Sequence, residues 1–393
     1  MKRTALAVVL ALATSGCTKA ELLDFAMRTA PHGRSSAAMR VGPYRVLAGD
    51  LHTHVLPPDP TWHVTRGFDE TATLAEREGL DFVVLTPHVP SRFFADPDAR
   101  AWVQATQAEL RARIAARPSS VLFVPGMEYT DYEYGHLGLA FADLDDVLAD
   151  VPLDAGREEP ERFFERWKAH GGVMTINHPT LRAMPQAPFR ELRYDMGWRA
   201  LFVPARPVPS DIAWITEHAQ TIETSNTSIS HLRDQFVVGD AERTLREGAH
   251  LADRVARTQH RRFTPVGGSD SRGSWLRATT WVLAHERTAA SIRAGIVAGR
   301  TCVRGPEACT FVARTRGGEW ANVGGAVHTS SARSIDVRSE GADAAYYVNG
   351  AIAGVARDGE TVSIAVPGTC ALVRAVVGSS WSAPVHVDCD WAR

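Results

Sequence analysis

The sequence lacks any block or arm of basic residues. Its 393 residues include 43 Lys and Arg against 45 Asp and Glu, a formal net charge of −2. Proteins that bind nucleic acid through the phosphate backbone need concentrated positive charge, because neutralisation of the phosphates supplies much of the affinity. The charge balance therefore gives no support to a nucleic-acid partner, and we expect none.

The sequence also lacks an apolar run long enough to cross a bilayer. Residues 5–13 form a short apolar run after Lys2 and Arg3, and small residues follow, which is the layout of a secretory signal. Cys17 comes directly after Ser-Gly and resembles the acylated cysteine of bacterial lipoproteins, although Thr14 stands where leucine is usual. We favour a lipoprotein over a plain signal peptide with a chance cysteine.

This reading places the protein outside the cytoplasm in either case. We expect residues 1–17 to be a lipoprotein-type signal peptide and residues 18–40 to be a flexible tether. The lipid at Cys17 would be the sole contact with a membrane, and the folded part would face the periplasm.

Cysteine is absent between Cys17 and Cys302. The other four cysteines, Cys302, Cys309, Cys370 and Cys389, all lie in the last hundred residues, and an even number in an oxidising compartment favours disulfides over a zinc site. Four cysteines permit three pairings. Proximity in the sequence favours Cys302 with Cys309 and Cys370 with Cys389.

Short apolar runs alternate with helical patterns over residues 41–300. The runs indicate strands at 46–50, 82–86, 121–125, 172–176, 221–223 and 264–268, and the intervening patterns indicate helices at 71–78, 99–116, 161–169 and 242–258. Continuous apolar runs are typical of strands buried on both faces of a parallel sheet. Polar residues follow most of the runs, which favours a barrel whose strand ends converge on one site over an open doubly wound sheet.

The pattern changes after a predicted connecting helix at 287–298. Residues 301–393 carry short runs at 334–337, 346–349, 361–366 and 372–377 between Gly-rich turns, which predicts a small all-β sandwich. His328 and His386 occur singly in this region. An isolated histidine of this kind is more often a surface residue or a satisfied buried one than a metal ligand.

The sharpest local motif is the pair His52 and His54, which are two residues apart at the end of a predicted strand. Such side chains point to the same side of the strand and can share one metal ion. A lone His-x-His is common by chance. Its weight comes from further polar residues that follow or flank later predicted strands, namely His88, Glu128, His136, His178 and Asp270.

This ordered set of motifs resembles the polymerase and histidinol phosphatase (PHP) superfamily of metal-dependent hydrolases over residues 45–272. The resemblance implies a distorted (β/α)7 barrel with two or three divalent metal ions. The β-rich tail after Gly-Arg-Thr-Cys looks like the branch that includes carbaryl hydrolase. Members of that branch also carry a β domain after the barrel.

Carried over by position, the resemblance makes His52, His54 and Asp270 ligands of one metal ion. Glu128 would bridge it to a second ion held by His136 and His178. His88, in Thr86-Pro87-His88 where the family has Thr-Asp-His, would serve a third ion. Imidazole and carboxylate ligands in this mixture suit zinc, manganese or iron.

Arg272 is a further departure, because the family's Ser-Asp-Ser-His motif ends here in arginine. An arginine cannot lose its proton to bind a metal ion, but its guanidinium suits a phosphate or carboxylate. We therefore favour a site with two metal ions in which Arg272 is a catalytic residue that clamps an anionic small-molecule substrate. The alternative is that Arg272 marks a decayed active site.

Several residues near these motifs allow two interpretations of their role. Glu223 and Asn226 resemble the family's Ile-Glu-x-x-Asn stretch and would orient the ligand histidines or cap a strand. Asp50 is grouped with the catalytic residues as a hydrogen-bond partner beside the metals rather than as a ligand. His63 or Asp59 would help a third metal or be plain loop residues.

The leading functional hypothesis is hydrolysis of a phosphoester by a hydroxide held between two metal ions. One alternative is hydrolysis of a carbamate, carboxylic ester or amide at the same site. Another is a non-catalytic envelope protein that uses the barrel as a scaffold for binding. Trp62 and Tyr129 lie near the ligand motifs, where aromatic residues either line a pocket or simply pack.

Overall fold

The computed structural model describes residues 39–131, 135–179, 213–228, 241–329 and 333–392. The expected signal peptide, Cys17 and nearly all of the expected tether lie outside these residues, so these expectations stay predictions. Among the described helices, none combines the length and the apolar character that crossing a bilayer requires.

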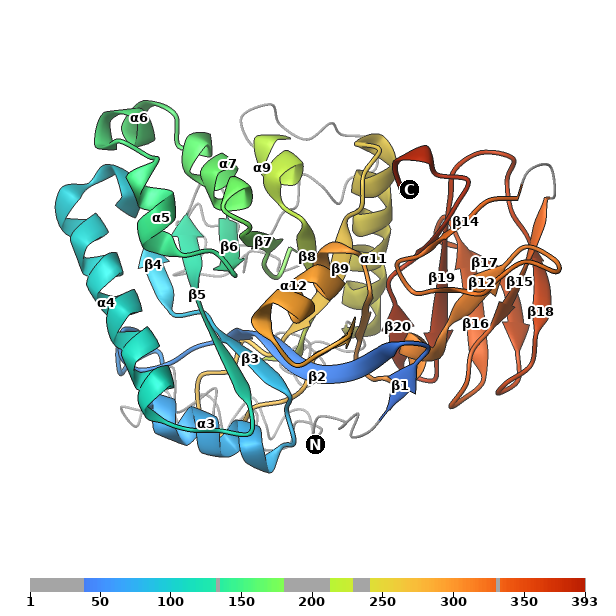
Figure 1. Ribbon diagram of the computed structural model, residues 1–393, viewed down its shortest axis with the longest axis horizontal. Coiled ribbons are helices and arrows are strands. Elements are labelled where there is room, and N and C mark those ends of the chain that lie inside the picture. Colours follow the sequence, from blue (N-terminus) through green and yellow to red (C-terminus); the bar gives the residue numbers. More distant parts are fainter. Residues whose placement is uncertain (1–38, 132–134, 180–212, 229–240, 330–332, 393) are drawn as a thin grey trace, which may run out of the picture.

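Seven strand positions form a closed barrel in the N-terminal part of the chain (Figure 1). The strands are β2 (Tyr44–Thr53), β3 (Phe82–Leu85) continued by β4 (His88–Pro90), β5 (Leu122–Asp131), β6 (Gly135–Ala140), β7 (Val173–Ile176), β8 (Thr221–Asn226) and β9 (Thr264–Gly268). Each strand pairs with the next in this order. The ring closes where Asp270 N donates to His52 O at 2.8 Å and Thr53 bridges to Ser271.

The strand β6 is antiparallel to both of its neighbours, whereas the other pairs within the ring are parallel. This reversal is what makes the barrel a distorted one. The sequence did not predict β6, because its residues Gly-His-Leu-Gly-Leu-Ala contain no β-branched side chain and no helical pattern separates it from β5. The reversal brings the first residues of β6, rather than its last, to the end of the barrel where the parallel strands finish.

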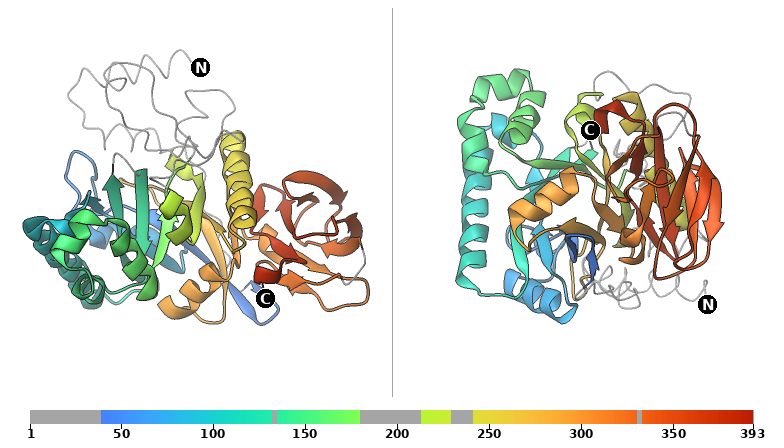
Figure 2. Two further views of the ribbon diagram at one scale, coloured as in Figure 1. Left: turned by 90° about the horizontal axis from the view of Figure 1, so that it is seen from above. Right: turned by 45° about the vertical axis from the view of Figure 1, so that its right-hand side comes forward.

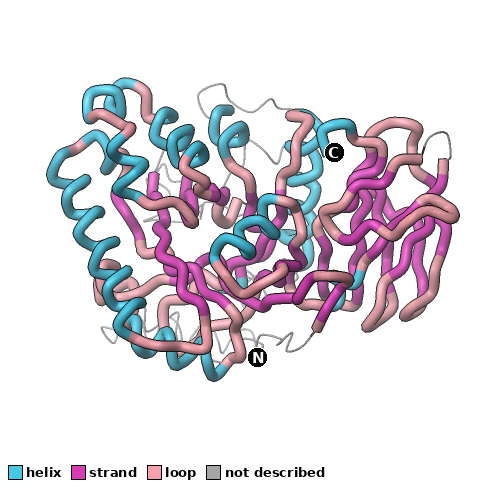
Figure 3. Tube along the Cα trace, viewed as in Figure 1, coloured by secondary structure: helices cyan, strands magenta, loops and turns pink. Residues whose placement is uncertain are grey.

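Helices surround the barrel, while strands and loops dominate the C-terminal part (Figure 3). They are α3 (Phe68–Arg77), α4 (Pro97–Ala116), α5 (Leu144–Ala149), α6 (Leu153–Glu158), α7 (Glu161–Ala169), α9 (Ala213–His218), α11 (Ala241–Thr258) and α12 (Ala289–Val297), with a 3₁₀ turn η1 (Phe93–Ala95). The start of α4 shows why they form: Asp96 accepts a hydrogen bond from Ala99 N at 2.8 Å and Pro97 takes the first helical position.

The remaining strands build a two-layered β-sandwich at the C-terminal end. One layer contains β11 (Thr301–Val303), β14 (Ala326–Val327), β16 (Ala344–Val348), β17 (Ala351–Ala356), β19 (Ala371–Val377), β20 (Ser380–Ser382) and β21 (Val385–Val387). The other contains β12 (Val312–Arg314), β13 (Ala321–Asn322), β15 (Ser334–Arg338) and β18 (Val362–Ala365). Ile335, Tyr346 and Ile364 are buried between the layers. The fold class predicted from the sequence, a distorted α/β barrel followed by an all-β sandwich, is confirmed.

The two parts are joined through continuous strand pairing. β10 (Thr280–Ala284) pairs with β2 of the barrel and with β11, and β11 pairs with β20 of the sandwich. A short strand β1 (Arg40–Val41) extends the edge beside β2, and the 3₁₀ turns η2 (Glu307–Thr310) and η3 (Asp390–Ala392) complete the C-terminal part. The expected border after residue 300 falls at the start of β11.

Helix α11 lies between the barrel and the sandwich, as the left view of Figure 2 shows. Its Leu245 and Ala249 pack against Val303 and Trp381 of the sandwich side. Its Asp253 forms a buried ion pair with Arg374 of β19, in which Arg374 Nε lies 2.9 and 3.0 Å from the two carboxylate oxygens. The paired contacts of Arg374 with one buried carboxylate fix how α11 lies against β19, so this ion pair favours one arrangement of the two parts.

Both expected disulfides are present. Cys302 is bonded to Cys309, and Cys370 to Cys389. The first links β11 to the turn η2, and the second links the residue before β19 to the second residue after β21. Both therefore join segments within the sandwich, the structural role expected from the sequence.

His386 makes the stability of the sandwich depend on pH. It is buried, and burial together with the charges of Arg262 and Arg374 lowers its pKa to about 3. In the unfolded chain the pKa of histidine is about 6.5, so the unfolded state binds the extra proton between these values. Stability is therefore full above about pH 6.5 and falls as the pH drops towards 3. We expect His386→Leu to remove about 2 kcal/mol of the loss between pH 7 and 4.5.

The free energy of unfolding in urea at pH 7 and pH 4.5 measures this effect. The matched control is His328→Gln, because the His328 side chain is about half exposed. An identical loss of stability in wild type, His386→Leu and His328→Gln would show that His386 is not the group that titrates.

Candidate metal centre

All seven metal ligands expected from the sequence meet at one end of the barrel. His52 is the last residue but one of β2, His88 begins β4, Glu128 lies in β5 and His136 is the second residue of β6. His54, His178 and Asp270 follow β2, β7 and β9 within two residues. The carboxyl ends of parallel strands share one end of a barrel, and the reversal of β6 brings its start to the same end.

Glu128 is the centre of this cluster. Its Oε1 lies 3.1 Å from His52 Nε2, 3.1 Å from His136 Nδ1 and 3.3 Å from His178 Nε2. Its Oε2 lies 3.0 Å from His88 Nδ1. The side chain is fully buried. One carboxylate thus contacts imidazoles from four strand positions, which is the placement that a bridging ligand requires.

A group suited to one metal ion is formed by His52, His54 and Asp270, whose ligand atoms lie within 4.8 Å of one another. Asp270 Oδ1 lies 3.2 Å from His54 Nε2 and 3.8 Å from His52 Nε2. These are the three residues that the PHP resemblance assigns to a single ion.

The other groups differ in part from the grouping that the resemblance implies. His136 shares a group with His88 and Glu128, whereas His178 shares one with His52 and Glu128. The reason is that β4 and β6 lie on either side of β5, so that both of their histidines face Glu128.

A further group contains His54, His63 and His88, and His63 Nε2 lies 2.8 Å from His88 Nε2. His63 comes from the loop after β2, where the sequence allowed either a ligand or a plain loop residue. The structure brings it into the cluster.

The buried ligand atoms pass a simple test of fit to divalent cations. Within the described residues, six buried side-chain atoms of this cluster form no hydrogen bond of ordinary geometry, although charged groups lie within ion-pair distance of most of them: His52 Nε2, His54 Nε2, His136 Nδ1, His178 Nδ1, Glu128 Oε2 and Asp270 Oδ1. Buried polar atoms normally have partners, because leaving one unpaired costs about 1–3 kcal/mol. Imidazole nitrogens and carboxylate oxygens are suitable ligands for zinc, manganese or iron, so the residues present fit such ions.

The electrostatics of the cluster favour cations. Burial would raise the pKa of Glu128, but the charges of His52, His136 and His88 outweigh it and hold the pKa well below its usual value. Likewise, burial alone would lower the pKa of His52, yet Glu128 and Asp270 raise it well above normal. A field that holds a proton on His52 would also attract a metal ion, which carries more charge.

For His136 and His88, the effect of burial on the pKa outweighs the effect of the neighbouring charges. Burial lowers the pKa of His136 to about 4 although Glu128 opposes the shift. Burial also lowers the pKa of His88, again against the charge of Glu128. A neutral imidazole has a lone pair available, so both rings are ready to act as ligands near neutral pH.

Carboxylates behind the ligands fix the orientation of the rings. Glu223 Oε1 lies 3.1 Å from His52 Nδ1, and Asp59 Oδ2 lies 2.9 Å from His54 Nδ1. With Nδ1 donating to a carboxylate, the Nε2 lone pair of each ring faces the cluster. Asn226 Nδ2 donates to Glu223 Oε2 at 3.1 Å and so supports the same arrangement. Glu223 and Asn226 thus lie where the sequence placed orienting residues.

Asp50 lies behind the cluster rather than in it. Its carboxylate accepts hydrogen bonds from Ser269 N at 2.8 Å and Thr279 Oγ1 at 3.0 Å, and also from the hydroxyls of Thr53 and Ser269. These bonds tie β2 to the segments around β9 and β10. The sequence grouped Asp50 with catalytic residues, but its contacts are those of a residue that holds the barrel seam together.

Arg272 contacts the cluster directly. Its Nη2 lies 2.6 Å from Asp270 Oδ1, and its Nε donates to His63 Nε2 at 2.9 Å. The charge of Arg272 is the strongest influence that lowers the pKa of Asp270 against the effect of burial. The guanidinium is therefore part of the cluster itself, in addition to any contact it makes with a substrate.

Sequence reasoning gave no role to three supporting residues. Asn177 Nδ2 donates to Glu128 Oε1 at 2.9 Å, and Thr130 Oγ1 lies 2.8 Å from His88 Nδ1. Arg66 is buried and its Nη1 donates to Ser271 Oγ and Trp275 O, both at 2.7 Å, which holds the loop after β9. Asn177 could have been found from its place beside His178, whereas nothing in the sequence around Arg66 marks it.

Two ligands have a backbone conformation that non-glycine residues rarely adopt. The φ angle is +25° at His178 and +52° at Asp270. Such conformations cost about 1–3 kcal/mol and cluster at functional sites. Both residues lie two positions after a strand end, so the turn that aims their side chains inward accounts for the strain.

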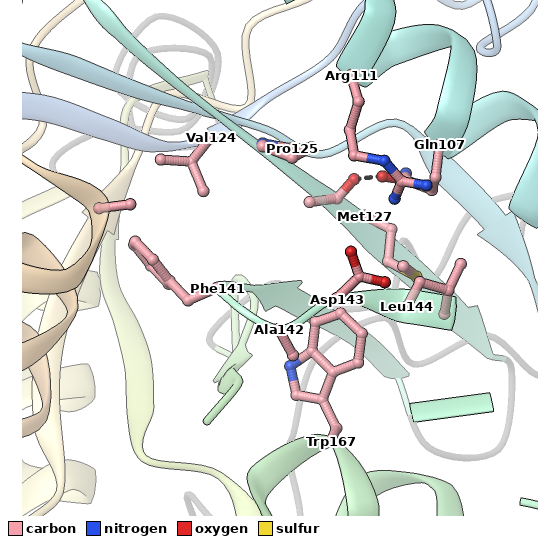
Figure 4. A pocket seen from close by; sticks show the side chains of 12 residues that line it. Gln107, Arg111, Val124, Pro125, Met127, Phe141, Ala142, Asp143, Leu144 and Trp167 are labelled. Carbon is pink, nitrogen blue, oxygen red and sulfur yellow. Dashed lines mark hydrogen bonds between the residues drawn. The ribbon is translucent and has the colours of Figure 1, made fainter. Parts of the chain in front are cut away.

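A cavity lies next to this cluster, and a smaller one lies elsewhere. The adjacent cavity includes His63, His88 and His136 in its lining. The smaller cavity, about 210 Å³, is lined by Gln107, Phe141, Trp167 and others (Figure 4). Because β6 (Gly135–Ala140) has His136 near its start and Phe141 follows its end, Phe141 lies at the opposite end of the barrel from the cluster, and the smaller cavity is not part of the site.

No protein-family model matches the chain, and no curated protein does. Among solved structures, one similar chain is a two-domain protein from Bacteroides vulgatus described as containing a predicted PHP-like metal-dependent phosphoesterase. It has 14% identity and a TM-score of 0.46, over 91% of this chain and 100% of that one.

Two further solved structures are similar at lower TM-scores. The lesion-specific endonuclease Q of Pyrococcus furiosus has 13% identity and a TM-score of 0.38, over 70% of this chain and 64% of that one. An amidohydrolase from Chromobacterium violaceum has 16% identity and a TM-score of 0.31, over 57% and 88%. The three include a protein described as PHP-like, the superfamily that the sequence motifs resemble, while the likeness of the tail to the carbaryl-hydrolase branch stays a prediction.

Proposed function

We propose that this protein is a metal-dependent hydrolase that cleaves phosphoesters. The observation that carries the proposal is the buried cluster in which Glu128 contacts the imidazoles of His52, His88, His136 and His178. Six buried atoms of this cluster, among them His52 Nε2 and His136 Nδ1, form no hydrogen bond of ordinary geometry, and a structural role alone does not explain so many of them at one end of a barrel.

The chain's own residues would hold and orient the reacting groups. His52, His54 and Asp270 would hold one ion, and Glu128 would join it to a second position beside His88 and His136. Divalent ions bound there would supply an acidified water and stabilise charge on the oxygens of the substrate. Glu223 and Asp59 would keep the ligand rings of His52 and His54 turned inward.

The preference for phosphorus over carbon rests on the charge of Arg272. Its guanidinium sits at the edge of the cluster, with a side chain that is 12% exposed. A fixed cation beside the ligands favours a substrate with anionic oxygens, and the guanidinium geometry suits phosphate. A carboxylic ester or carbamate would gain less from this contact, which is why these substrates take second place.

Metal analysis and turnover on one sample test the proposal. The protein would be assayed for bound zinc, manganese and iron by elemental analysis, and for hydrolysis of an aryl phosphate and the matching aryl acetate. We expect about two equivalents of metal together with phosphatase turnover. Ester turnover alone would replace phosphoesters by carboxylic esters as the substrate class, and absence of bound metal after reconstitution would overturn the proposal.

Arg272→Ala is expected to lower kcat/KM for the aryl phosphate about tenfold, chiefly through KM, because a charge-assisted contact to the phosphate oxygens is lost. Arg272→Lys should recover only part of the loss, since an ammonium group cannot make the paired contact. Turnover of the aryl acetate is the internal control. An equal loss on both substrates, or a lower metal content, would show that Arg272 acts on Asp270 rather than on substrate.

A further inference from the structure

A cavity of about 900 Å³ opens beside the metal centre. Its lining includes His88 and His136 at one end and Trp62, Asp98 and Trp102 at the other. His88 and His136 contact Glu128, so this end of the cavity is the metal centre itself. Whatever fills the cavity is therefore part of, or next to, the molecule that reacts.

The other end of the cavity is aromatic and open to solvent. Trp62, in the loop after β2, is 57% exposed, and Trp102, on α4, is 44% exposed. Within the described residues, five large hydrophobic side chains are exposed, and the two tryptophans among them both line this cavity. Leaving indole rings in water forfeits the favourable burial of a large apolar surface, so exposed tryptophans gathered at one cavity point to a ligand.

The charges along the cavity indicate which kind of chemical group it can bind. Away from the histidines, Asp98 is the charged residue of the lining, and Pro60, Val89 and Pro90 add apolar surface beside the tryptophans. An anionic group would be repelled by Asp98, and a strongly polar group would gain little from the apolar walls. The part of the ligand that lies here is therefore uncharged and apolar.

We infer that this cavity, called here the tryptophan groove, binds a planar aromatic group esterified to the scissile phosphorus. The inference rests on the proposed function and names its substrate class. Indole rings favour flat π-systems through stacking, and a volume of about 900 Å³ is large enough for a fused ring system. On hydrolysis, water supplies the oxygen that bonds to phosphorus, the bond from phosphorus to the aryl oxygen breaks, and the aryl alcohol leaves with a proton.

Binding of phosphonates that cannot be hydrolysed tests the groove without turnover. The dissociation constants of methylphosphonate and of 1-naphthylmethylphosphonate for the metal-loaded full chain would be measured by calorimetry. We expect the naphthyl compound to bind at least about tenfold more tightly than the methyl compound. Trp102→Ala and Trp62→Ala should each weaken naphthyl binding about tenfold and leave methylphosphonate binding within about twofold.

Trp102→Phe should retain most of the naphthyl affinity, because it keeps an aromatic face. Trp320→Ala, in the β-sandwich, is the matched control and should change neither constant. Equal affinity of wild type for the two compounds, or unchanged naphthyl binding in both groove variants, would overturn the inference. Turnover of 1-naphthyl phosphate is measured separately: its absence alongside the expected binding pattern would reject the proposed reaction and leave the groove as an aromatic binding site.

Discussion

Glu128→Gln is expected to remove at least one equivalent of bound metal and to lower kcat about 1,000-fold or more. Glutamine has nearly the same shape, but its amide carries no negative charge and presents N–H donors to whatever it faces. Glu128 contacts the imidazoles of four strand positions. No other described carboxylate lies in two of the candidate ligand groups, so the centre has no substitute for it.

Elemental analysis and steady-state kinetics on the same preparations measure this effect, with circular dichroism to show that the barrel is folded. Glu109→Gln is the matched control, because Glu109 is an exposed residue of α4 paired with Arg113. It should keep both metal and turnover. Wild-type metal content and kcat in Glu128→Gln would disprove the bridging role.

The sequence predicted those parts of the fold that depend on local patterns of apolar and polar residues. The strand at 264–268 and the helix at 161–169 have the predicted bounds, because a buried apolar run and an amphipathic pattern each bury the side chains that define them. The strand β6 was not predicted, since its direction depends on pairing with β5 and β7 rather than on its own residues. Strand pairing depends on residues far apart in the sequence. A short run with two glycines and no β-branched residue gives little indication that it forms a strand.

In the candidate site, too, the features that depend on local motifs were predicted and those that depend on distant residues were not. Some ligand histidines follow or flank a strand that the sequence predicts, and the others lie near a recognisable motif. The set could therefore be identified from the sequence alone. Which ligands share an ion depends on the order of strands around the barrel, and this is why His136 is grouped with His88 rather than with His178. The contact of Arg272 with His63 was likewise beyond the sequence, because it joins residues 209 positions apart.

The supporting residues behind the ligands were the hardest to predict. Glu223 was found because it belongs to a motif, whereas Arg66 lies in an ordinary polar loop and acquires its role only when the loop after β9 folds against it. Buried polar networks of this kind are defined by which groups meet in space. Residues that hold ligands in place therefore need the structure more than the ligands themselves do.

Gly268→Ala is expected to disrupt the metal centre by displacing a ligand and the residue that supports it, although the change adds a single methyl group. An ideal Cβ at Gly268 would lie 1.9 Å from Glu223 Oε1 and 2.5 Å from His52 Cβ. Neither neighbour can move freely, because Glu223 also accepts from His178 N at 2.6 Å and His52 belongs to β2. We expect a loss of stability of about 2–3 kcal/mol, as for overpacked cores, together with weakened metal binding.

Gly368→Ala is the matched control, since an ideal Cβ there meets no atom within 4 Å and the φ angle is not positive. Urea unfolding with and without a chelator separates the two expected effects: overpacking lowers the stability of the metal-free protein, whereas displacement of Glu223 and His52 reduces the extra stability that bound metal confers. If Gly268→Ala matched Gly368→Ala in both measurements, the close packing of Glu223 behind His52 would not be what positions that ligand.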